Sequence, residues 1–310
     1  MPPSSRYNGT AEAIIDARER HDVYPSIDVN GALKDAAKGK IVLVTGAGKG
    51  VGAETARTYA KAGAKGILIT SRTLSDLARV REDILDKAKM DASGQYDAEL
   101  QVETFAADIS DPKQVQALVE FCLQKFGTLD IVISNAGFLS RWTPIAEHDP
   151  ELWWKTWETN IRGNFNLAHY SLPTLVASKG YFVVVSSIGA QLRWLGGSAY
   201  LGGKHALNRF AEYIDFEYGD QGVKSFAFHP GCLLTELGTN TPEVQGFVDA
   251  GVMKEDTVAL PASVLVRLTS GSEDWLTGRY VSANWDLDDV NKLKEKILKE
   301  NVLIDKLSLP

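Results

Sequence analysis

Short apolar runs alternate with longer amphipathic segments along most of this chain, and this alternation restricts the fold more than any other feature. The apolar runs have the length of strands, and the segments between them repeat their apolar residues with the period of a helix. Strands followed by helices of 10 to 15 residues form βαβ units with a parallel sheet. We therefore predict a single doubly wound, Rossmann-type α/β domain with about seven parallel strands flanked by helices. The predicted strands span 40–46, 66–72, 100–108, 129–137, 180–187 and 223–231, and the predicted helices span 50–63, 74–90, 111–127 and 150–178, with another around residue 200.

The first 39 residues lack this alternation. They are polar and interrupted by prolines and glycines, so we interpret residues 1–39 as an extension that packs on the surface, with one short helix over 10–21. The catalytic domain is predicted over 40–285, and residues 286–310 read as an amphipathic helical tail whose charges face outward.

Charge and cysteine content exclude several classes of function. The net charge of −7 at pH 7 disfavours a nucleic-acid partner, because phosphate binding needs a basic surface. Apolar runs such as 181–185 are far shorter than the ~20 residues of a membrane span, and residues 1–10 lack a signal-peptide pattern. Two cysteines, Cys122 and Cys232, suit a reducing compartment, so we expect a cytoplasmic protein. The five scattered histidines give no metal-ligand spacing, and no metal is expected.

A glycine cluster lies between the first predicted strand and the first predicted helix. Gly46, Gly50 and Gly52 allow a sharp turn that brings backbone N–H groups close to a ligand, and the positive end of the next helix points to the same place. A pyrophosphate fits such a turn, and the alternative is a glycine-rich turn without a ligand. We therefore predict a dinucleotide at the carboxyl edge of the sheet.

The end of the second predicted strand distinguishes between two dinucleotides. An NAD site usually has a carboxylate there for the ribose 2′-hydroxyl, but this strand ends in Ser71 and Arg72. Lys49 lies in the glycine loop on the same side. Two cations without a carboxylate fit a 2′-phosphate, so we predict NADP rather than NAD. The alternative is that both cations are solvated surface residues.

Two further polar residues end strands at the same edge. Asp108 follows the third predicted strand and suits the adenine amino group as a hydrogen-bond acceptor. Asn135 follows the fourth and suits the central strand and the edge of the cofactor. The alternative for each is that it only caps the next helix.

A tyrosine and a lysine, Tyr200 and Lys204, lie four positions apart and therefore one helical turn apart on one face. This spacing also arises by chance, so its context has to decide its meaning. Gly202 and Gly203 lie between them. These glycines either let a ligand approach the helix closely or loosen the start of the helix.

That context resembles the short-chain dehydrogenase/reductase family. The segments TGAGKGVG, ADIS, SNAG, ETNIRGNF, VVVSS, YLGGK and HPGCLLT occur in the order and at the spacing of the family over residues 40 to about 285. Ser187 precedes Tyr200 by the family's usual gap of thirteen positions, so Ser187 rather than Ser186 matches the catalytic serine. The stretch TGRYVSANWDLDD is similar to fungal members.

The resemblance implies a set of site residues. The catalytic residues would be Asn160, Ser187, Tyr200 and Lys204, with Asn160 holding a water that links Lys204 to solvent. The backbone of Leu233 and the Thr235 side chain would hold the carboxamide and phosphate of the cofactor, with hydride transferred from the B face of the nicotinamide. The cofactor-binding residues, including those argued above, would be Gly46, Lys49, Gly50, Val51, Gly52, Ser71, Arg72, Asp108, Ile109, Asn135, Ala136, Gly137, Tyr200, Lys204, Pro230, Gly231, Leu233 and Thr235.

Independently of the resemblance, the chemistry of these side chains also supports a reduction. Hydride addition to a ketone carbon leaves a negative oxygen that needs a proton, and Tyr200 can supply one. A free phenol with a pKa of about 10 is too weak an acid near neutral pH. We expect the Lys204 ammonium to lower the pKa of Tyr200 and to bind the nicotinamide ribose. Ser187 can donate a hydrogen bond to the substrate oxygen as charge develops.

Apolar and aromatic residues surround the predicted site, so we expect a hydrophobic or aromatic carbonyl substrate. Residues 236–251 read as a mobile lid or as an ordinary surface loop. Arg141 and Arg193 are weak support for a thioester substrate. The apolar wall comprises Phe138, Leu139, Trp142, Leu192, Trp194, Leu195 and Phe247.

The leading hypothesis is an NADP(H)-dependent oxidoreductase that reduces a ketone or aldehyde to an alcohol, or the reverse. One alternative is a dehydration, isomerisation or rearrangement at the same site, and another is a catalytically silent dinucleotide sensor. The intact Asn-Ser-Tyr-Lys set favours redox chemistry. Trp153, Trp154 and Trp157 read as packing residues on a helix that, by the resemblance, commonly helps form the dimer, so we expect a homodimer or homotetramer.

Overall fold

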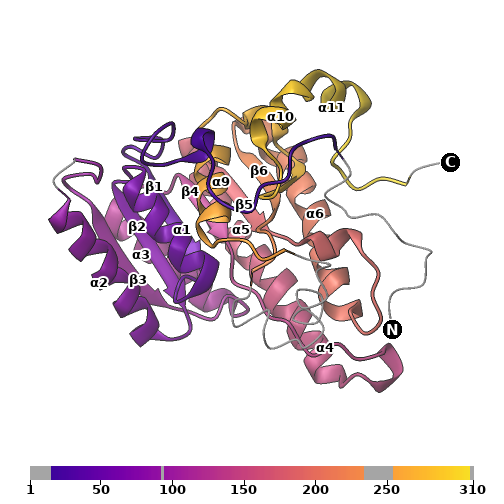
Figure 1. Cartoon of the computed structure of the whole chain (residues 1–310). Helices are drawn as coiled ribbons and strands as arrows, with labels where there is room; N and C mark the ends of the chain where they lie inside the picture. Colours follow the sequence, from indigo (N-terminus) through magenta and orange to yellow (C-terminus); the bar gives the residue numbers. More distant parts are fainter. Residues whose placement is uncertain (1–14, 92–93, 234–253, 308–310) are drawn as a thin grey trace.

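The computed structural model describes residues 15–91, 94–233 and 254–307. Seven strands form one parallel sheet in the order β3-β2-β1-β4-β5-β6-β7 (Figure 1). The strand order reverses between β1 and β4, and ligands of doubly wound sheets bind beyond the carboxyl ends of the strands at such a point. The strands are β1 (Ile41–Thr45), β2 (Gly66–Ser71), β3 (Gln101–Ala106), β4 (Ile131–Ser134), β5 (Tyr181–Val185), β6 (Lys224–His229) and β7 (Arg279–Ser282).

Helices cover both faces of the sheet (Figure 1). On one face α1 (Gly50–Lys61) packs against α2 (Leu74–Met90) and α9 (Ala259–Leu268). On the other face α3 (Pro112–Phe126) packs against α5 (Gly163–Ser178), and α6 (Ser198–Tyr218) packs against α4 (Pro150–Trp157). Every residue of β1, β4 and β5 is buried, as expected for strands that lie between two layers of helices.

The predicted fold class is confirmed, and the six predicted strands correspond to β1 to β6. The pattern of the chain did not locate β7 or α9. Strand β7 has only four residues and begins with an arginine. Helix α9 is buried on nearly all sides, so it lacks the polar stripe that gives a surface helix its periodicity.

The segment before the domain is built into it rather than laid on its surface. We call residues 15–24 the N-terminal arm. Over 15–21 the arm is not helical, in contrast to the prediction, and Glu19 forms an antiparallel bridge with Trp285 just after β7. The N–H of Arg20 donates to Asn284 O at 2.7 Å, and Asn284 Nδ2 donates back to Arg20 O at 2.9 Å. Farther along, Tyr24 and Ile27 lie in the hydrophobic core.

The predicted single C-terminal helix is two short helices, α10 (Leu287–Lys292) and α11 (Lys294–Glu300). Helix α10 is tied to the N-terminal arm by ion pairs, because the Arg18 guanidinium contacts Asp289 at 2.6 Å and Arg20 contacts the N-cap residue Asp286 at 2.6 Å. The described parts of the extension, domain and tail therefore share one core. Their boundaries at 39 and 285 stay a prediction.

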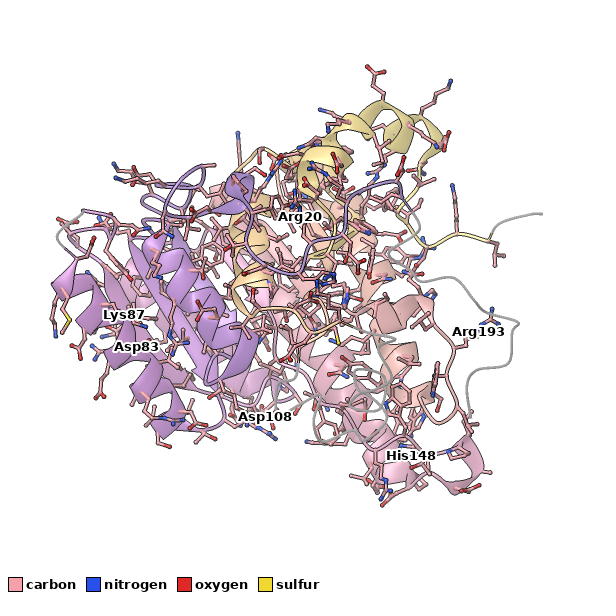
Figure 2. All side chains as sticks on the ribbon, viewed as in Figure 1. Arg20, Asp83, Lys87, Asp108, His148 and Arg193 are labelled. Carbon is pink, nitrogen blue, oxygen red and sulfur yellow. The ribbon has the colours of Figure 1, made fainter. Side chains whose placement is uncertain are left out.

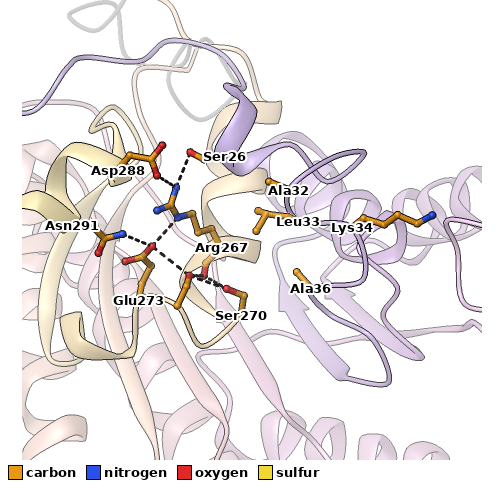
Figure 3. A pocket seen from close by; sticks show the side chains of 11 residues that line it. Ser26, Ala32, Leu33, Lys34, Ala36, Arg267, Ser270, Glu273, Asp288 and Asn291 are labelled. Atoms are coloured by element: carbon orange, nitrogen blue, oxygen red, sulfur yellow. Dashed lines mark hydrogen bonds and ion pairs between the residues drawn. The ribbon is translucent and has the colours of Figure 1, made fainter.

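A cavity of about 410 Å³ lies beside α9 (Figure 3). Its base is the buried Arg267, whose guanidinium binds Glu273 at 2.7 Å and both Ser26 and Asp288 at 2.8 Å. Asp274, next to this cluster, accepts a hydrogen bond from Tyr181 at the first residue of β5. The cavity is thus at the amino edge of the sheet, opposite the edge where ligands of such folds bind.

Candidate active site

The glycine turn after β1 is packed too tightly for side chains. Gly46 has φ +64°, and a Cβ there would lie 2.8 Å from the Ala136 Cα. A Cβ at Gly52 would lie 2.5 Å from the Gly46 oxygen. The turn leads directly into α1, so its backbone N–H groups and the helix dipole point beyond the carboxyl edge, where Gly50 and Val51 begin the helix. The residues of this turn and of the start of α1 therefore fit a bound pyrophosphate.

Asn135 connects that turn to the central strands. Its Nδ2 donates to Thr45 O at 2.9 Å and to Gly46 O at 3.3 Å. The backbone N–H groups of Asn135 and Ala136 both donate to Thr45 Oγ1 at 3.0 Å. Asn135 therefore stabilises the ends of β1 and β4 and holds the glycine turn between them.

The residues predicted to select NADP lie around the same turn. Lys49 and Arg72 are exposed, and the Ser71 hydroxyl would lie 3.1 Å from a Cβ at Gly48. The first turn of α2 adds Asp76, whose Cβ would lie 3.0 Å from the same position. The sequence prediction rests on the end of β2 and therefore misses Asp76, which lies in α2 and pairs with Arg79 at 2.5 Å.

Asp108 lies beyond β3 at the lower edge of the view in Figure 2. Its Oδ1 accepts hydrogen bonds from the Ser110 N–H at 2.9 Å and from the Ser110 hydroxyl at 2.6 Å. Burial raises the pKa of Asp108, but these bonds together with Lys155 and Arg72 outweigh burial and hold the pKa below its ordinary value. The cap of α3 is Asp111 instead, so Asp108 stays available at the edge.

A π-helical turn over Glu158–Arg162 joins α4 to α5 and presents Asn160. The Asn160 side chain is buried and exchanges two 2.8 Å hydrogen bonds with the backbone of Phe138. A Cβ at Gly137 would lie 3.3 Å from Asn160 Oδ1 and 3.8 Å from Lys204 Nζ. Gly137 therefore lets Asn160 and Lys204 approach one backbone, and the buried Ile109 packs against α5 at Gly163 nearby.

Tyr200, Lys204 and Ser187 meet at the end of β5. The Lys204 side chain is only 4% exposed, and its Nζ donates to Val185 O at 2.5 Å. Nζ also lies 5.5 Å from the centre of the Tyr200 ring, and the Tyr200 hydroxyl is hydrogen-bonded to Ser187. The Ser187 hydroxyl further accepts from the Gly189 N–H at 3.0 Å.

The pKa of Tyr200 is raised, whereas the sequence predicts that Lys204 lowers it. Burial raises it to about 12, and the hydrogen bond to Ser187 only partly opposes this rise. Burial also lowers the pKa of Lys204 to about 8. Desolvation disfavours the charged form of both groups, and here it dominates over the proximity of the lysine.

The choice of Ser187 over Ser186 agrees with their surroundings. The Ser186 hydroxyl is buried and donates to Lys204 O at 3.1 Å and to Asn208 Oδ1 at 2.6 Å. It holds β5 against α6 and faces away from solvent. Ser187 is half-buried and reaches Tyr200.

The loop after β6 lies next to Lys204. His229 ends the strand, and burial together with Lys204 lowers the pKa of His229 to about 3, so this imidazole is neutral. Pro230 and Gly231 follow, with Gly231 at φ +94°, and Leu233 is half-buried. Thr235, predicted to bind the cofactor, lies outside the described residues.

The two loops that form the predicted substrate wall pack on each other. The rings of Trp142 and Trp194 are 6.3 Å apart, and the Thr143 N–H donates to Gly196 O at 3.2 Å. Leu195 is largely exposed. Leu139 and Leu192 are half-buried in the same loops, and Phe247 and the predicted lid over 236–251 fall outside the described residues.

The helix around Tyr200 is held by tryptophans and has room at its glycines. Trp153 Nε1 donates to Ser198 Oγ at 3.1 Å and its ring stacks on Trp157 at 5.4 Å. A Cβ at Gly202 would meet Trp157 at 3.7 Å, which is ordinary contact. Among the described residues nothing lies within 4 Å of a Cβ at Gly203.

In the part of the chain that the structure describes, no group of three His, Cys, Asp or Glu side chains could hold a metal ion. No helix within those ranges is both long and apolar enough to cross a membrane.

Known proteins match both the sequence and the length of the chain. A family model described as short chain dehydrogenase matches residues 40–246. The short chain dehydrogenase mpl6 of Monascus purpureus is 38% identical over 310 residues, which cover 100% of this chain and 99% of that protein. The chain belongs to the short chain dehydrogenase family. The predicted resemblance to this family, with fungal relatives, is confirmed.

Solved structures agree with this fold. A 7 alpha-hydroxysteroid dehydrogenase complexed with NADH and 7-oxo glycochenodeoxycholic acid has a TM-score of 0.71 at 22% identity, covering 82% of this chain and 96% of that one. A 3-ketoacyl-(acyl-carrier-protein) reductase from Brucella melitensis complexed with NADH has a TM-score of 0.70 at 25% identity, covering 79% of this chain and 97% of that one. This short chain dehydrogenase therefore shares the doubly wound fold with both.

Proposed function

We propose that this short chain dehydrogenase is an NADP(H)-dependent oxidoreductase that reduces the carbonyl of a hydrophobic or aromatic small molecule to an alcohol, or catalyses the reverse. The observation that carries the proposal is the meeting of Tyr200, Ser187 and Lys204 at the end of β5, with Asn160 beside Lys204. The glycine turn supports a dinucleotide, because its close packing at Gly46 and Gly52 leads the backbone directly into the start of α1, where N–H groups and the helix dipole suit a pyrophosphate.

In the reduction, a dinucleotide held at the glycine turn would provide the hydride that the carbonyl carbon accepts. Ser187 donates a hydrogen bond to the carbonyl oxygen and stabilises the negative charge that develops there. Tyr200 gives its phenolic proton to the same oxygen. A burial-raised pKa of about 12 keeps Tyr200 protonated until that moment. Lys204 stabilises the phenolate that remains, and the ordered Asn160 side chain, bonded to Phe138, fixes the backbone beside Lys204.

NADP preference forms part of the same proposal. Lys49 and Arg72 are exposed next to the glycine turn, where a 2′-phosphate would lie, and Arg72 is close enough to influence the pKa of Asp108. Asp76 is a carboxylate nearby, but it is paired with Arg79. The two solved relatives described above contain NADH, so a direct comparison of NADPH with NADH is the decisive measurement.

The substrate class rests on the contact between Trp142 and Trp194, which lie in the loops that follow β4 and β5. Mixing the purified protein with NADPH and a panel of hydrophobic and aromatic ketones, and following the absorbance of the reduced nicotinamide, tests the activity. Consumption of NADPH with at least one ketone is the expected result. Tight NADPH binding without consumption across the panel would instead favour a non-redox reaction or a sensor.

A homodimer or homotetramer with a subunit contact through α5 and α6 completes the proposal. These helices expose Phe165, Tyr213 and, with 85% of its surface accessible, Phe216. Such exposed aromatic side chains on neighbouring helices are typical of interfaces between subunits. Light scattering should give the mass of an oligomer for the wild type and a smaller mass for Phe216→Glu. We also place the protein in the cytoplasm, supported by a content of two cysteines, Cys122 and Cys232, which suits a reducing compartment.

A further inference from the structure

Asp256 is a buried carboxylate that none of the proposed catalytic steps uses. Its side chain is 1% exposed. One oxygen, Oδ2, accepts from the Cys232 N–H at 2.6 Å and from Asn284 Nδ2 at 2.9 Å. The other, Oδ1, accepts from His21 Nδ1 at 2.6 Å. A buried carboxylate depends on such donors, because a buried charge that loses a hydrogen-bond donor costs free energy. The loss of one donor therefore favours a different position of the carboxylate.

The loop after β6 packs directly on this carboxylate. Gly231 has φ +94°, and a Cβ there would lie 2.5 Å from Asp256 Oδ2. The Asp256 N–H donates to Cys232 O at 2.8 Å, so Asp256 and Cys232, 24 positions apart, exchange two hydrogen bonds. This loop follows His229, which is close enough to Lys204 for that cation to lower its pKa. The position of Asp256 therefore sets the backbone next to the proposed nicotinamide end of the site.

His21 comes to Asp256 from the N-terminal arm, 235 positions away. The His21 carbonyl accepts from the Thr257 N–H at 3.0 Å, and its neighbour Arg20 is bound to Asn284 through both backbone groups. The His21 side chain is only 20% exposed. The arm, Asn284 and Asp256 thus form one connected hydrogen-bond network at the carboxyl edge of β6 and β7.

We propose that His21 is a positioning residue for the cofactor site, acting through Asp256 on the backbone of Gly231 and Cys232. Without His21, Oδ1 of the buried carboxylate has no donor from the described residues. The carboxylate then rotates or draws in water to satisfy Oδ1, and Oδ2 moves away from the Cys232 N–H. The shifted loop weakens contacts with the nicotinamide half of a dinucleotide and leaves the adenine half unaffected. This inference rests on the proposed function.

The experiment compares the two halves of the cofactor on the full-length protein. NADPH binding is followed by the emission of its reduced nicotinamide, and adenosine 2′,5′-bisphosphate, the adenine half, by calorimetry. NADH and AMP replace them if the wild type binds NADH more tightly. In His21→Ala we expect NADPH to bind about tenfold more weakly, which is ~1.4 kcal/mol. The adenine half should bind within about twofold of the wild type, and the nicotinamide emission of the complex should change.

Two further variants separate positioning from folding. His21→Asn keeps a side-chain N–H that can donate to Asp256 Oδ1, so it should recover most of the NADPH affinity. Arg18→Ala removes another contact of the same arm, the ion pair with Asp289, without touching Asp256. It should bind both ligands like the wild type.

The outcomes distinguish the two proposals. A wild type that binds the dinucleotide and a His21→Ala variant that binds it equally well would overturn the inference alone. Equal weakening of both ligands in His21→Ala, without rescue by His21→Asn, would also overturn it, because that result indicates general destabilisation. A wild type that binds neither dinucleotide would overturn the proposed function and the inference together.

Discussion

The Lys204 ammonium lies 5.5 Å from the centre of the Tyr200 ring while it donates a hydrogen bond to the carbonyl of Val185. The lysine is thereby anchored to the last residue of β5, and the tyrosine is carried by the first turn of α6. A strand and a helix that pack together hold the two groups in a fixed relation. This relation connects the proposed proton donor to the group that stabilises its phenolate.

Replacing Tyr200 with phenylalanine should remove the reaction and keep cofactor binding. The ring and its packing remain, but the proton donor to the substrate oxygen is lost, so turnover should fall by about 10²- to 10⁴-fold. The measurement is NADPH consumption with an active ketone, alongside NADPH affinity. Tyr96→Phe, the same change at a tyrosine outside the proposed site and the proposed subunit interface, is the control. Full activity of Tyr200→Phe would rule out the proposed mechanism.

The buried Lys204 should make stability depend on pH above neutrality. Its pKa is about 8 when folded against 10.5 as the ordinary value, so between these limits the unfolded chain binds more protons. Stability therefore rises with pH across this window. From about pH 7 to about pH 9.5 the free energy of unfolding should increase by about 2 kcal/mol more in the wild type than in Lys204→Met. Urea unfolding at both pH values measures these free energies. An equal change between the two pH values in the wild type and in Lys204→Met would contradict the prediction.

Two glycines should respond oppositely to alanine. At Gly52 a Cβ would lie 2.5 Å from Gly46 O and 2.6 Å from Asn135 Nδ2, so the turn must shift. We expect Gly52→Ala to lose about 1–3 kcal/mol of stability and most of its NADPH affinity. At Gly203 the space is open among the described residues, and alanine favours the helix by about 0.5–1 kcal/mol. Thermal unfolding with and without NADPH tests both, and a destabilised Gly203→Ala would refute the second expectation.

Arg72 should select between the two dinucleotides. If its guanidinium binds the 2′-phosphate, Arg72→Ala should weaken NADPH by about tenfold and leave NADH unchanged. Lys87→Ala is the matched control, because Lys87 is an exposed cation farther along α2, paired with Asp83 at 2.9 Å (Figure 2). Titration of both dinucleotides into each variant gives the answer. Parallel loss of NADPH and NADH affinity would show that Arg72 acts in some other way.

The ends of the chain show where prediction from sequence failed. Residues 15–21 were predicted as part of a helix, but there the backbone hydrogen-bonds to residues just after β7. Those partners lie more than 260 positions away, as in the 264 positions between Arg20 and Asn284. Local periodicity contains no information about such pairs. For the same reason the sequence did not indicate that His21 reaches Asp256.

Near the glycine turn, prediction from the sequence is incomplete for a different reason. Strand-end chemistry indicates Ser71 and Arg72, which stay a prediction, but it does not reach Asp76, because Asp76 lies in the first turn of the following helix. The sequence also gives no indication of the π-helical turn at Asn160, because the helical pattern continues on both sides of this turn.

The sequence by itself determined the order of β1 to β6, with helices between them, and the family to which the chain belongs. These follow from local periodicity and from motifs at fixed spacing, which can be recognised without knowledge of distant contacts. Only the tertiary structure decided that the N-terminal arm is part of the core and that Asp256 supports the loop after β6. It also decided the direction of the pKa shift at Tyr200. Burial and long-range hydrogen bonds arise only when segments far apart in the chain come together, and these set the energies of buried charges.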